Sequence, residues 1–272
     1  MPKVSILIPT HNRPNNVKRA ITSALNQNIK DVEIIVRNDS DTNILYPINW
    51  IRKNVDLYYE EEAKGFDYAY VSLIKKATGK YIYYLEDDDY LVNKDILKKC
   101  VDMMEKNNKI NASIFKSSTK LTDYILYKNK QVKNRVIKSS QMFEMFPDIS
   151  IDFQLGQVFF RKELVKDIIL EEDYGSEVNT DASIFLKLCL QGGYIALLDE
   201  IGFIITIGKD NLSWFNFENC FYGAHSYINR IYTLAKKKNI KNLDLWKEKM
   251  ENNHIDFILK YLDDYYAGII NE

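Results

Sequence analysis

The sequence predicts an α/β protein with a parallel, doubly wound sheet and a C-terminal helical extension. Short continuous apolar runs, typical of buried strands, alternate in the first part of the chain with segments whose apolar residues recur at helical spacing. Polar clusters follow directly after several of these runs. From residue 214 onward the pattern is helical and contains no proline, which predicts the extension.

The elements of the first part follow one another as strand and helix. Val4–Ile8 is an apolar run closed by Pro9, as in a buried strand. Pro14 suits the first turn of a helix, and the apolar residues after it share one helical face. We then expect a strand at Val32–Val36, a short strand at Leu57–Tyr59, a helix at about Asp67–Ala77 and a strand at Tyr81–Leu85.

After the fourth strand the pattern becomes mixed. The expected elements are a helix at about Lys94–Lys106, a strand at Ala112–Lys116, a polar hairpin at Tyr124–Val132, a strand at Val158–Arg161, a helix at Asp181–Leu190, strands at Tyr194–Leu198 and Phe203–Ile207, and helices at about Glu218–Lys236 and Leu243–Tyr266.

Composition limits the class of protein. The chain has 272 residues, 46% hydrophobic and 28% charged, which is ordinary for a globular protein with a sizeable core. With 37 basic and 38 acidic residues the net charge is −1, so we expect no nucleic-acid partner. The three cysteines lie far apart and suit a reducing cytoplasm. The N-terminal apolar run is too short for a signal peptide, and no stretch reaches the length of a membrane span, which predicts a cytoplasmic protein.

Polar clusters follow three of the predicted strands, at Pro9–Arg13, Asn38–Asp41 and Glu86–Asp89. Ligands of open α/β sheets bind beyond the carboxyl ends of the strands, so these clusters are expected to converge on one crevice. In the stretch YIYYLEDDDYL, four successive carboxylates follow a buried strand. Such carboxylates repel each other unless a cation offsets their charge. The sequence therefore favours a divalent metal site over an acidic turn that faces water.

Motifs in a particular order resemble the inverting family 2 glycosyltransferases of the GT-A fold, a Rossmann-like, doubly wound mixed sheet. The motifs are VSILIPTHNRP, ALNQNIKDVEIIVRNDS, ATGKYIYYLEDDDYL, FFRKEL and NTDASIFLKLCLQGG, followed by DNLS. The resemblance covers about residues 3–213. It implies a glycosyltransferase domain over 1–213, with a nucleotide-sugar half at 1–89 and an acceptor half at 90–213, before a helical extension over 214–272. The stretch GFDYAYVSLIKKATGKYIYYLEDDD is also similar to a subgroup that acts on bacterial surface polysaccharides.

The resemblance implies a nucleoside diphosphate sugar as donor. Asp39 follows the second strand, where the family's aspartate hydrogen-bonds a pyrimidine base, and an acceptor there suits the imide N–H of uracil or thymine. UDP- or dTDP-sugars are therefore favoured, with a turn-forming acid as the alternative for Asp39. Pro9 and Thr10 would line the base pocket, and His11 would pack or stack there. The expected nucleotide-binding residues are Pro9, Thr10, His11, Asn12, Asp39, Asp87 and Asp88.

The acidic run, defined here as Glu86–Asp89, resembles the family's DxD element. By position, Asp87 faces the ribose or the phosphates, and Asp88 or Asp89 ligates Mg²⁺ or Mn²⁺; the choice between the two stays open. A hard cation held by carboxylate oxygens can neutralise a diphosphate leaving group. Glu86 is expected to support the site from outside the metal's direct ligands.

Asp181, in NTDASIFLKLC, corresponds to the family's catalytic base. A base must take the proton of the acceptor hydroxyl as that hydroxyl attacks the anomeric carbon. The alternative is that Asp181 only stabilises the start of a helix. Glu177 is the second candidate for the base.

Two departures from the family pattern affect the metal and the phosphates. Relatives often carry an Arg and a His where this chain has Thr206 and Gly208, so we expect the metal to bind poorly before the donor arrives. Relatives also often place an Arg-Asn pair where this chain has Tyr70 and Val71. Phosphate binding would then depend on the metal and on lysines, namely Lys64, Lys75 or Lys209.

Other functions stay open as alternatives. A nucleotidyltransferase on a related fold would need a Gly-rich, basic loop after the first strand, and PTHNRPNN contains no glycine. A non-catalytic nucleotide-sugar-binding or scaffold protein is the second alternative. The expected acceptor is a glycan or a lipid-linked glycan, which allows work at the inner face of the membrane. Aromatic residues of the C-terminal helices favour packing or homo-oligomer formation over peripheral membrane contact.

Overall fold

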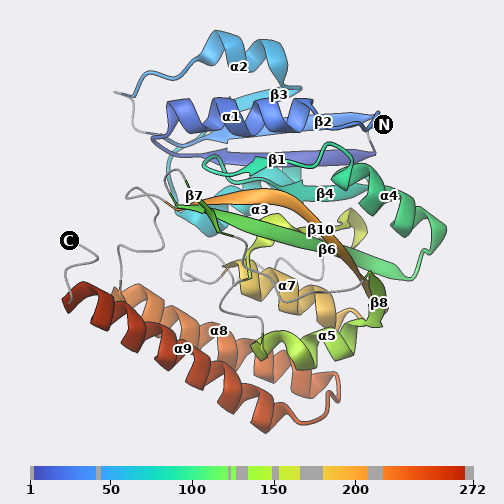
Figure 1. The fold of residues 1–272 in the computed structure, drawn as a ribbon, viewed down its shortest axis with the longest axis vertical. Helices are drawn as coiled ribbons and strands as arrows, with labels where there is room; N and C mark the ends of the chain where they lie inside the picture. The colour runs from blue at the N-terminus through green and yellow to red at the C-terminus, as the bar shows by residue number, and fades with distance from the viewer. Residues whose placement is uncertain are drawn as a thin grey trace.

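One mixed β-sheet forms the centre of the protein (Figure 1). This computed structural model describes residues 3–40, 44–121, 124–126, 134–148, 153–165, 180–207 and 217–266. Within them the main sheet has the strand order β3-β2-β1-β4-β9-β6-β10-β5, and β7 and β8 pair with β6 and β10. The strands are β1 (Val4–Thr10), β2 (Val32–Asn38), β3 (Leu57–Glu60), β4 (Tyr81–Tyr84), β5 (Tyr90–Leu91), β6 (Ile110–Leu121), β7 (Tyr124–Leu126), β8 (Arg135–Lys138), β9 (Val158–Arg161) and β10 (Tyr194–Ile207).

The first four strands are parallel to one another, as predicted. Every residue of β1 and β4 is buried, which explains why both read as uninterrupted apolar runs rather than as alternating ones. Because these strands are parallel, the segments after β1, β2 and β4 leave the sheet at the same edge. That edge carries the three polar clusters.

The second half of the sheet is mixed. β9 is antiparallel to both β4 and β6, whereas β10 runs parallel to β6. The two strands predicted at 194–198 and 203–207 are one long strand, β10, so that prediction of a break was wrong. Shifts in register between Leu198 and Phe203 absorb the polar residues there while β10 stays paired with β6 on both sides. Gly202 lies in this bulge, where a Cβ would be 2.2 Å from the Phe115 ring.

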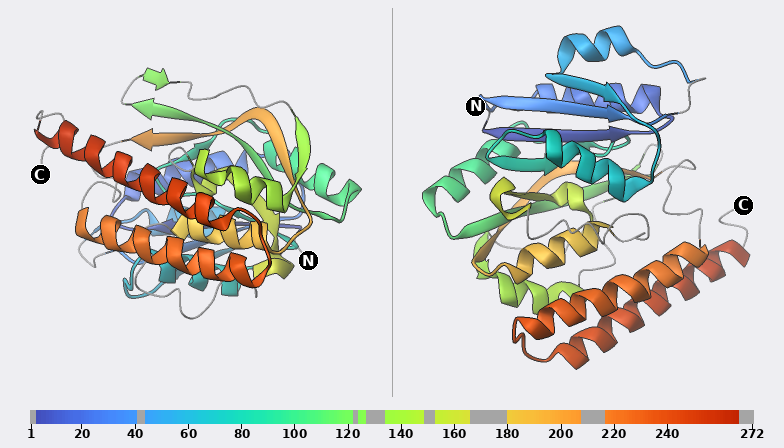
Figure 2. Two further views of the ribbon diagram at one scale, coloured as in Figure 1. Left: turned by 90° about the horizontal axis from the view of Figure 1, so that it is seen from below. Right: turned by 180° about the vertical axis from the view of Figure 1, so that it is seen from behind.

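Helices cover both faces of the sheet (Figure 2). One apolar cluster joins β1, β2 and β4 to α1 and α4, and Ile51 of α2 lies in it. The other joins the sheet to α3, α5, α7, α8 and α9. The helices are α1 (Pro14–Leu25), α2 (Ile48–Asn54), α3 (Phe66–Lys76), α4 (Ile96–Lys106), α5 (Ser139–Met145), α7 (Thr180–Leu190), α8 (Phe217–Lys237) and α9 (Leu243–Tyr266), with 3-10 turns η1 (Phe146–Asp148), η3 (Leu155–Gln157) and η4 (Lys162–Leu164). The short helices α2 and α5 were not predicted.

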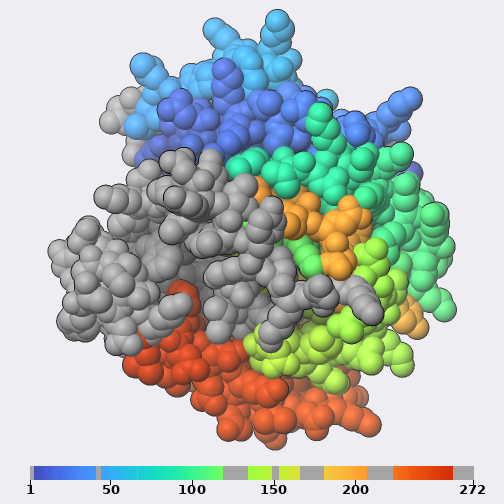
Figure 3. All heavy atoms as spheres, in the orientation of Figure 1, coloured from blue at the N-terminus to red at the C-terminus, as the bar shows by residue number. Residues whose placement is uncertain are grey.

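The C-terminal helices α8 and α9 pack against each other (Figure 1) and against the rest of the protein, where the red atoms of these helices adjoin those of α5 (Figure 3). The ring of Trp246 stacks on Phe143 of α5 with centroids 4.7 Å apart, and its Nε1–H donates to the Phe143 carbonyl oxygen at 3.0 Å. Tyr227 is also buried. Trp246 and Tyr227 therefore serve packing. None of the described helices is both long enough and apolar enough to span a bilayer.

Candidate active site

The acidic run leaves β4 at the edge where the parallel strands end. Leu85 N–H still donates to the Leu7 carbonyl at 3.0 Å, so the chain stays beside β1 until the run begins. The Asp89 N–H then donates to the Glu86 carbonyl at 3.1 Å and closes a tight turn. Asp87, Asp88 and Asp89 are all buried, with 2%, 8% and 3% of their surface exposed. The run therefore points into the protein, and the surface-turn alternative is wrong.

Arg13 neutralises part of this charge. A single guanidinium nitrogen, Nη1, lies 2.9 Å from Asp87 Oδ1 and 2.8 Å from Asp88 Oδ2. Burial opposes the charge of Arg13, but Asp87 and Asp88 outweigh this and raise its pKa. The Arg13 backbone N–H donates to the Tyr46 hydroxyl at 2.7 Å. Arg13 belongs to the first polar cluster, but the sequence pattern did not predict this role for it.

Arg19 of α1 ties the acidic run to the end of β10. Its Nη2 donates to the carbonyl oxygen of Asp88 and, at 3.0 Å, to the Thr206 hydroxyl. Thr206 N–H donates in turn to Asp89 Oδ1 at 2.8 Å. The family resemblance implied an Arg at the position of Thr206, and here α1 brings a guanidinium to the same place. Gly208 and Lys209 lie outside the described residues.

Asp39 lies directly after β2, facing the loop that follows β1. Its Oδ2 is 2.5 Å from Nη1 of Arg37, a fully buried arginine that also contacts Glu61 at 3.2 Å. The ring Nδ1 of His11 is 3.0 Å from the Asp39 carbonyl oxygen and 3.2 Å from its Oδ1. Asp39 is thus held by side chains on both carboxylate oxygens. We predicted no role for Arg37 from the sequence, although a charged residue at the end of an apolar strand run can signal a buried ion pair.

The remaining predicted nucleotide residues frame the same edge. Thr10 Oγ1 donates to Asp87 Oδ2 at 2.8 Å and so joins the first cluster to the acidic run. Asn12 has a left-handed φ of 55°, and its N–H donates to Ser40 Oγ at 2.7 Å. Pro9 pairs with Arg37 in the register of β1 and β2. The first cluster therefore contacts both of the others at this edge of the sheet, where the sequence predicted that they meet.

Asp181 lies in the first turn of α7 and approaches the acidic run from the opposite half of the chain. Its Oδ2 accepts a hydrogen bond from the backbone N–H of Leu155 at 3.0 Å. Its Oδ1 is buried and has no hydrogen-bond partner among the described residues. Burial raises the pKa of Asp181 to about 6, although the bond from Leu155 opposes this shift. Glu177 lies outside the described residues.

The site carries more negative than positive charge. Burial, and next to it Asp181, raises the pKa of Glu86 well above its usual range, which places Asp181 close to the acidic run. Burial and Asp88 do the same to Asp89. Burial raises the pKa of Asp87 to about 6 against the opposing effect of Arg13. A cation of higher charge would relieve this excess.

The side chains of the acidic run are suitable ligands for a divalent cation, but they are not arranged around a single metal position. Its carboxylate oxygens are the donors that Mg²⁺ and Mn²⁺ prefer. Across the described residues, however, no three Asp, Glu, His or Cys side chains are grouped to hold a metal ion. Arg13 lies against two of the carboxylates, and Asp89 is bonded to Thr206. The donors fit the cation provided that these contacts change when it binds.

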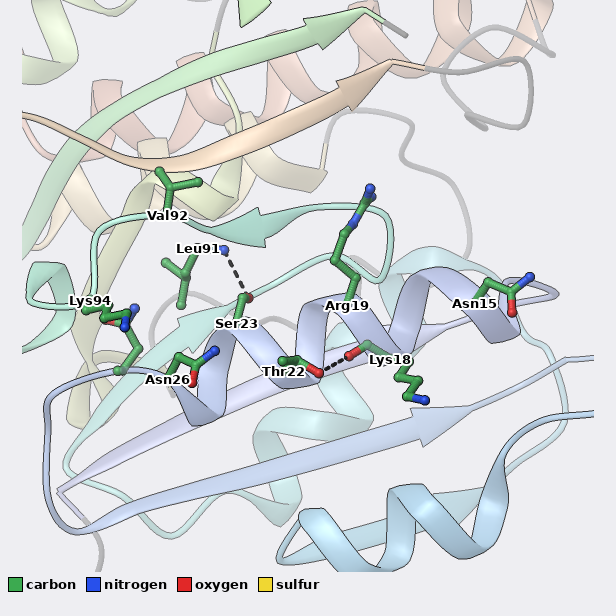
Figure 4. Close-up of a pocket in the computed structure, with 10 residues that line it drawn as sticks. Asn15, Lys18, Arg19, Thr22, Ser23, Asn26, Leu91, Val92 and Lys94 are labelled. Carbon is green, nitrogen blue, oxygen red and sulfur yellow. Dashed lines mark hydrogen bonds between the residues drawn. The ribbon is translucent and has the colours of Figure 1, made fainter. Parts of the chain in front are cut away.

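A pocket of about 460 Å³ lies beside α1, next to the acidic run (Figure 4). It is lined mainly by polar residues of α1 and of the segment around β5, where Ser23 Oγ accepts from Leu91 N–H at 3.0 Å. Arg19 is the lining residue that also contacts the acidic run. None of the predicted site residues lines this pocket.

Comparison with known proteins identifies the family. The profile of glycosyl transferase family 2 matches residues 5–168, more than half of the chain. An uncharacterized glycosyltransferase of Rickettsia bellii (strain RML369-C) is 37% identical over 108 residues, which are 39% of this chain and 16% of the relative. The chondroitin synthase of Pasteurella multocida (strain Pm70) is 26% identical over 240 residues, 85% of this chain and 24% of the relative. The chain therefore spans less than two thirds of the length of these relatives.

Solved structures show the same fold. The crystal structure of S. aureus TarS 1-349 in complex with UDP-GlcNAc has a TM-score of 0.72 and 16% sequence identity, covering 94% of this chain and 73% of that one. This likeness concerns the fold and confirms the predicted GT-A architecture. Together with the family profile and with the acidic run at the sheet edge, it shows that the chain belongs to glycosyl transferase family 2.

Proposed function

We propose that this protein is an inverting glycosyltransferase that moves a sugar from a UDP- or dTDP-sugar to a hydroxyl of a glycan or lipid-linked glycan. The observation that supports this most is the meeting of three elements at one sheet edge. Asp39 contacts His11 and the buried acidic run contacts Thr10, and Asp181 lies close enough to that run to raise the pKa of Glu86. Such an edge can bind a charged donor and activate a hydroxyl beside it.

The nucleotide half of the proposal, residues 1–89, rests on Asp39 and its neighbours. Arg37 and His11 fix the orientation of the Asp39 carboxylate. A carboxylate accepts up to about four hydrogen bonds, so capacity remains for the imide N–H of uracil or thymine. The relative in the TarS crystal holds UDP-GlcNAc, and its shared fold supports a UDP-sugar as the first donor to test.

We propose Mg²⁺ or Mn²⁺ as cofactor, held by Asp88 or Asp89 with the donor's phosphates. The cation would neutralise the charge of the nucleoside diphosphate as it leaves. This chain's own residues surround that place: Asp87 is oriented by Thr10, and Thr206 orients Asp89. Arg13 and Arg19 supply positive charge beside this place, in addition to any of the lysines expected from the sequence.

Asp181 is proposed as the base in the acceptor half, residues 90–213. Its Oδ2 is held by the backbone of Leu155 in η3, a separate element, which supports a role beyond capping its own helix. The unpartnered Oδ1 can take the proton of an acceptor hydroxyl. A pKa of about 6 leaves Asp181 ionised at neutral pH yet more basic than an ordinary aspartate.

The setting of the reaction is proposed as the synthesis of a bacterial surface polysaccharide. The segment Gly65–Tyr70, whose sequence is similar to that subgroup, forms the start of α3. With a lipid-linked acceptor, the enzyme would work in the cytoplasm at the inner face of the membrane. Residues 214–272 would form the helical extension, through which two copies could associate.

A screen of nucleotide sugars, read by mass spectrometry, tests the proposal. We expect hydrolysis or transfer with a UDP- or dTDP-sugar in the presence of Mn²⁺, and none with EDTA. A double variant, Asp88→Asn with Asp89→Asn, should lose both turnover and metal-dependent UDP binding. UDP binding without turnover of any donor would support the scaffold alternative instead. Release of pyrophosphate from a nucleoside triphosphate would indicate a nucleotidyltransferase.

A further inference from the structure

Arg13 lies where the acidic run would receive a divalent cation. Its Nη1 bridges Asp87 Oδ1 at 2.9 Å and Asp88 Oδ2 at 2.8 Å. We propose that Arg13 is the built-in counter-ion of the acidic run. Its guanidinium occupies Asp87 and Asp88 in the nucleotide-free protein and moves to the donor's diphosphate when a cation takes Asp88. The inference rests on the proposed function and assigns it a positioning residue.

The contacts distinguish Arg13 from the other nearby arginine. Arg19 donates to the carbonyl oxygen of Asp88 and to the hydroxyl of Thr206. Arg13, by contrast, donates to two carboxylate oxygens, one of them on a predicted metal ligand. A cation that approaches Asp88 therefore meets a positive charge already in contact with that residue. Only the removal of Arg13 should free the carboxylate oxygens themselves.

The backbone of Arg13 allows such an exchange of partners. Its N–H is held by the hydroxyl of Tyr46, which is itself 2.9 Å from Thr10 Oγ1, so the main chain is anchored to the site. The side chain is 16% exposed and is long enough to turn about this anchor. Arg13 also immediately precedes α1, and helix N-termini favour phosphate groups. A guanidinium that leaves carboxylates for a diphosphate keeps its charge paired and its hydrogen bonds satisfied.

Metal and donor should therefore bind cooperatively. Without nucleotide, the cation must displace Arg13 from two buried carboxylates and leave the guanidinium without an anion. With nucleotide, the diphosphate receives the guanidinium, so displacement costs less. By linkage, the nucleotide strengthens cation binding by the same factor as the cation strengthens nucleotide binding.

Arg13→Gln tests this inference through two affinities, measured by calorimetry and by Mn²⁺ electron paramagnetic resonance. For the nucleotide-free protein we expect Mn²⁺ to bind about tenfold tighter than to wild type, because a charge in contact with Asp88 is gone. For the protein saturated with Mn²⁺ we expect UDP to bind about tenfold weaker, because a charge-assisted contact to the diphosphate is lost. The two changes have opposite signs, which a purely structural role would not produce.

Arg19→Gln is the matched control. It also removes one guanidinium beside the acidic run, but one that contacts no carboxylate oxygen there. Its effect on Mn²⁺ binding without nucleotide should be clearly smaller than that of Arg13→Gln. If Mn²⁺ bound equally more tightly to both variants, the effect of Arg13 would be that of any nearby positive charge, and the inference would be wrong.

The remaining outcomes are also decisive. If Arg13→Gln weakens both Mn²⁺ and UDP, or changes neither, Arg13 is not an exchangeable counter-ion. Thermal unfolding of each variant is measured alongside. If Arg13→Gln does not fold, Arg13→Lys is used in its place. Its affinity for Mn²⁺ without nucleotide should stay near that of wild type, and its affinity for UDP should fall. An unchanged affinity for UDP would contradict the inference. If the wild-type protein binds no Mn²⁺ even with UDP, both this inference and the proposed metal-dependent transfer are wrong. If the wild-type protein binds Mn²⁺ but Arg13→Gln does not bind it more tightly, only this inference is wrong.

Discussion

The two sides of the site treat their carboxylates differently. On the side that we propose to bind the nucleotide, called the nucleotide side, Asp39 contacts Arg37, and Asp87 and Asp88 contact Arg13. On the side that we propose to receive the acceptor, called the acceptor side, Asp181 receives one backbone N–H, and its second oxygen has no hydrogen-bond partner among the described residues. A carboxylate held by cations is suited to binding, because its geometry is fixed and its charge is stabilised. One that is buried and half-satisfied is suited to taking up a proton.

The comparison is tested most strongly by Asp181→Asn. The amide keeps the size of the side chain and can still accept from Leu155, but it cannot take a proton. We expect kcat to fall by about 10²–10⁴, the usual loss for a general base, with nearly unchanged UDP affinity. The measurement is steady-state kinetics beside calorimetric titration with UDP. A variant that retains more than about a tenth of kcat would return Asp181 to a structural role and make Glu177 the next candidate.

Asp39→Asn tests the opposite side. A neutral amide pairs poorly with the buried Arg37 and offers the base a weaker acceptor. A hydrogen bond to a charged group contributes about 1.5–3 kcal/mol, so we expect UDP to bind roughly tenfold to a hundredfold more weakly. The value of kcat at saturating donor should change much less. Equal loss of affinity for a purine nucleotide would show that Asp39 supports the fold rather than reading the base.

The pH dependence separates the two sides in a single protein. With a pKa of about 6, Asp181 is protonated below that pH, so kcat should fall about tenfold per pH unit on the acidic side. The free energy of unfolding should change with pH in the opposite direction to kcat. The folded state holds the Asp181 proton more tightly than the unfolded chain, whose aspartates titrate near 3.9. The free energy of unfolding of the metal-free protein should therefore fall as the pH rises from about 4 to about 6.

The control for this titration is Asp181→Asn. Each unit of pKa difference corresponds to about 1.4 kcal/mol, so a loss of roughly 3 kcal/mol across this pH window should disappear in the variant. Chemical denaturation at several pH values measures it. An unchanged pH slope in Asp181→Asn would contradict the assigned pKa.

The sequence predicted local features of the site but not the contacts between segments that lie far apart in the chain. Elements whose signal is local were confirmed: the buried strands β1, β2 and β4 stand out as apolar runs, and the acidic run follows β4 directly. What could not be predicted depends on contacts between distant segments. Arg13 meets Asp88 across 75 positions, and Arg19 meets Thr206 across 187. No local sequence pattern predicts such a pairing. By contrast, an arginine within the segment of β2, Arg37, is a local signal from which a buried ion pair could have been predicted.

The smallest expected effect concerns the packing behind the acceptor side. Trp246 of α9 stacks on Phe143 and bonds its carbonyl, and both residues share an apolar cluster with Phe185 of α7, the helix that carries Asp181. Trp246→Phe keeps an aromatic ring but removes the hydrogen bond and part of the buried surface. We expect it to lower the free energy of unfolding by about 1–2 kcal/mol. Because Trp246 stacks on α5, which packs against α7, the helix that carries Asp181, kcat should fall slightly, while UDP affinity stays unchanged. Denaturant titration measures the change in stability, and steady-state kinetics with UDP titration measures kcat and UDP affinity. Weaker UDP binding with unchanged kcat would mean that the C-terminal helices support the nucleotide side instead.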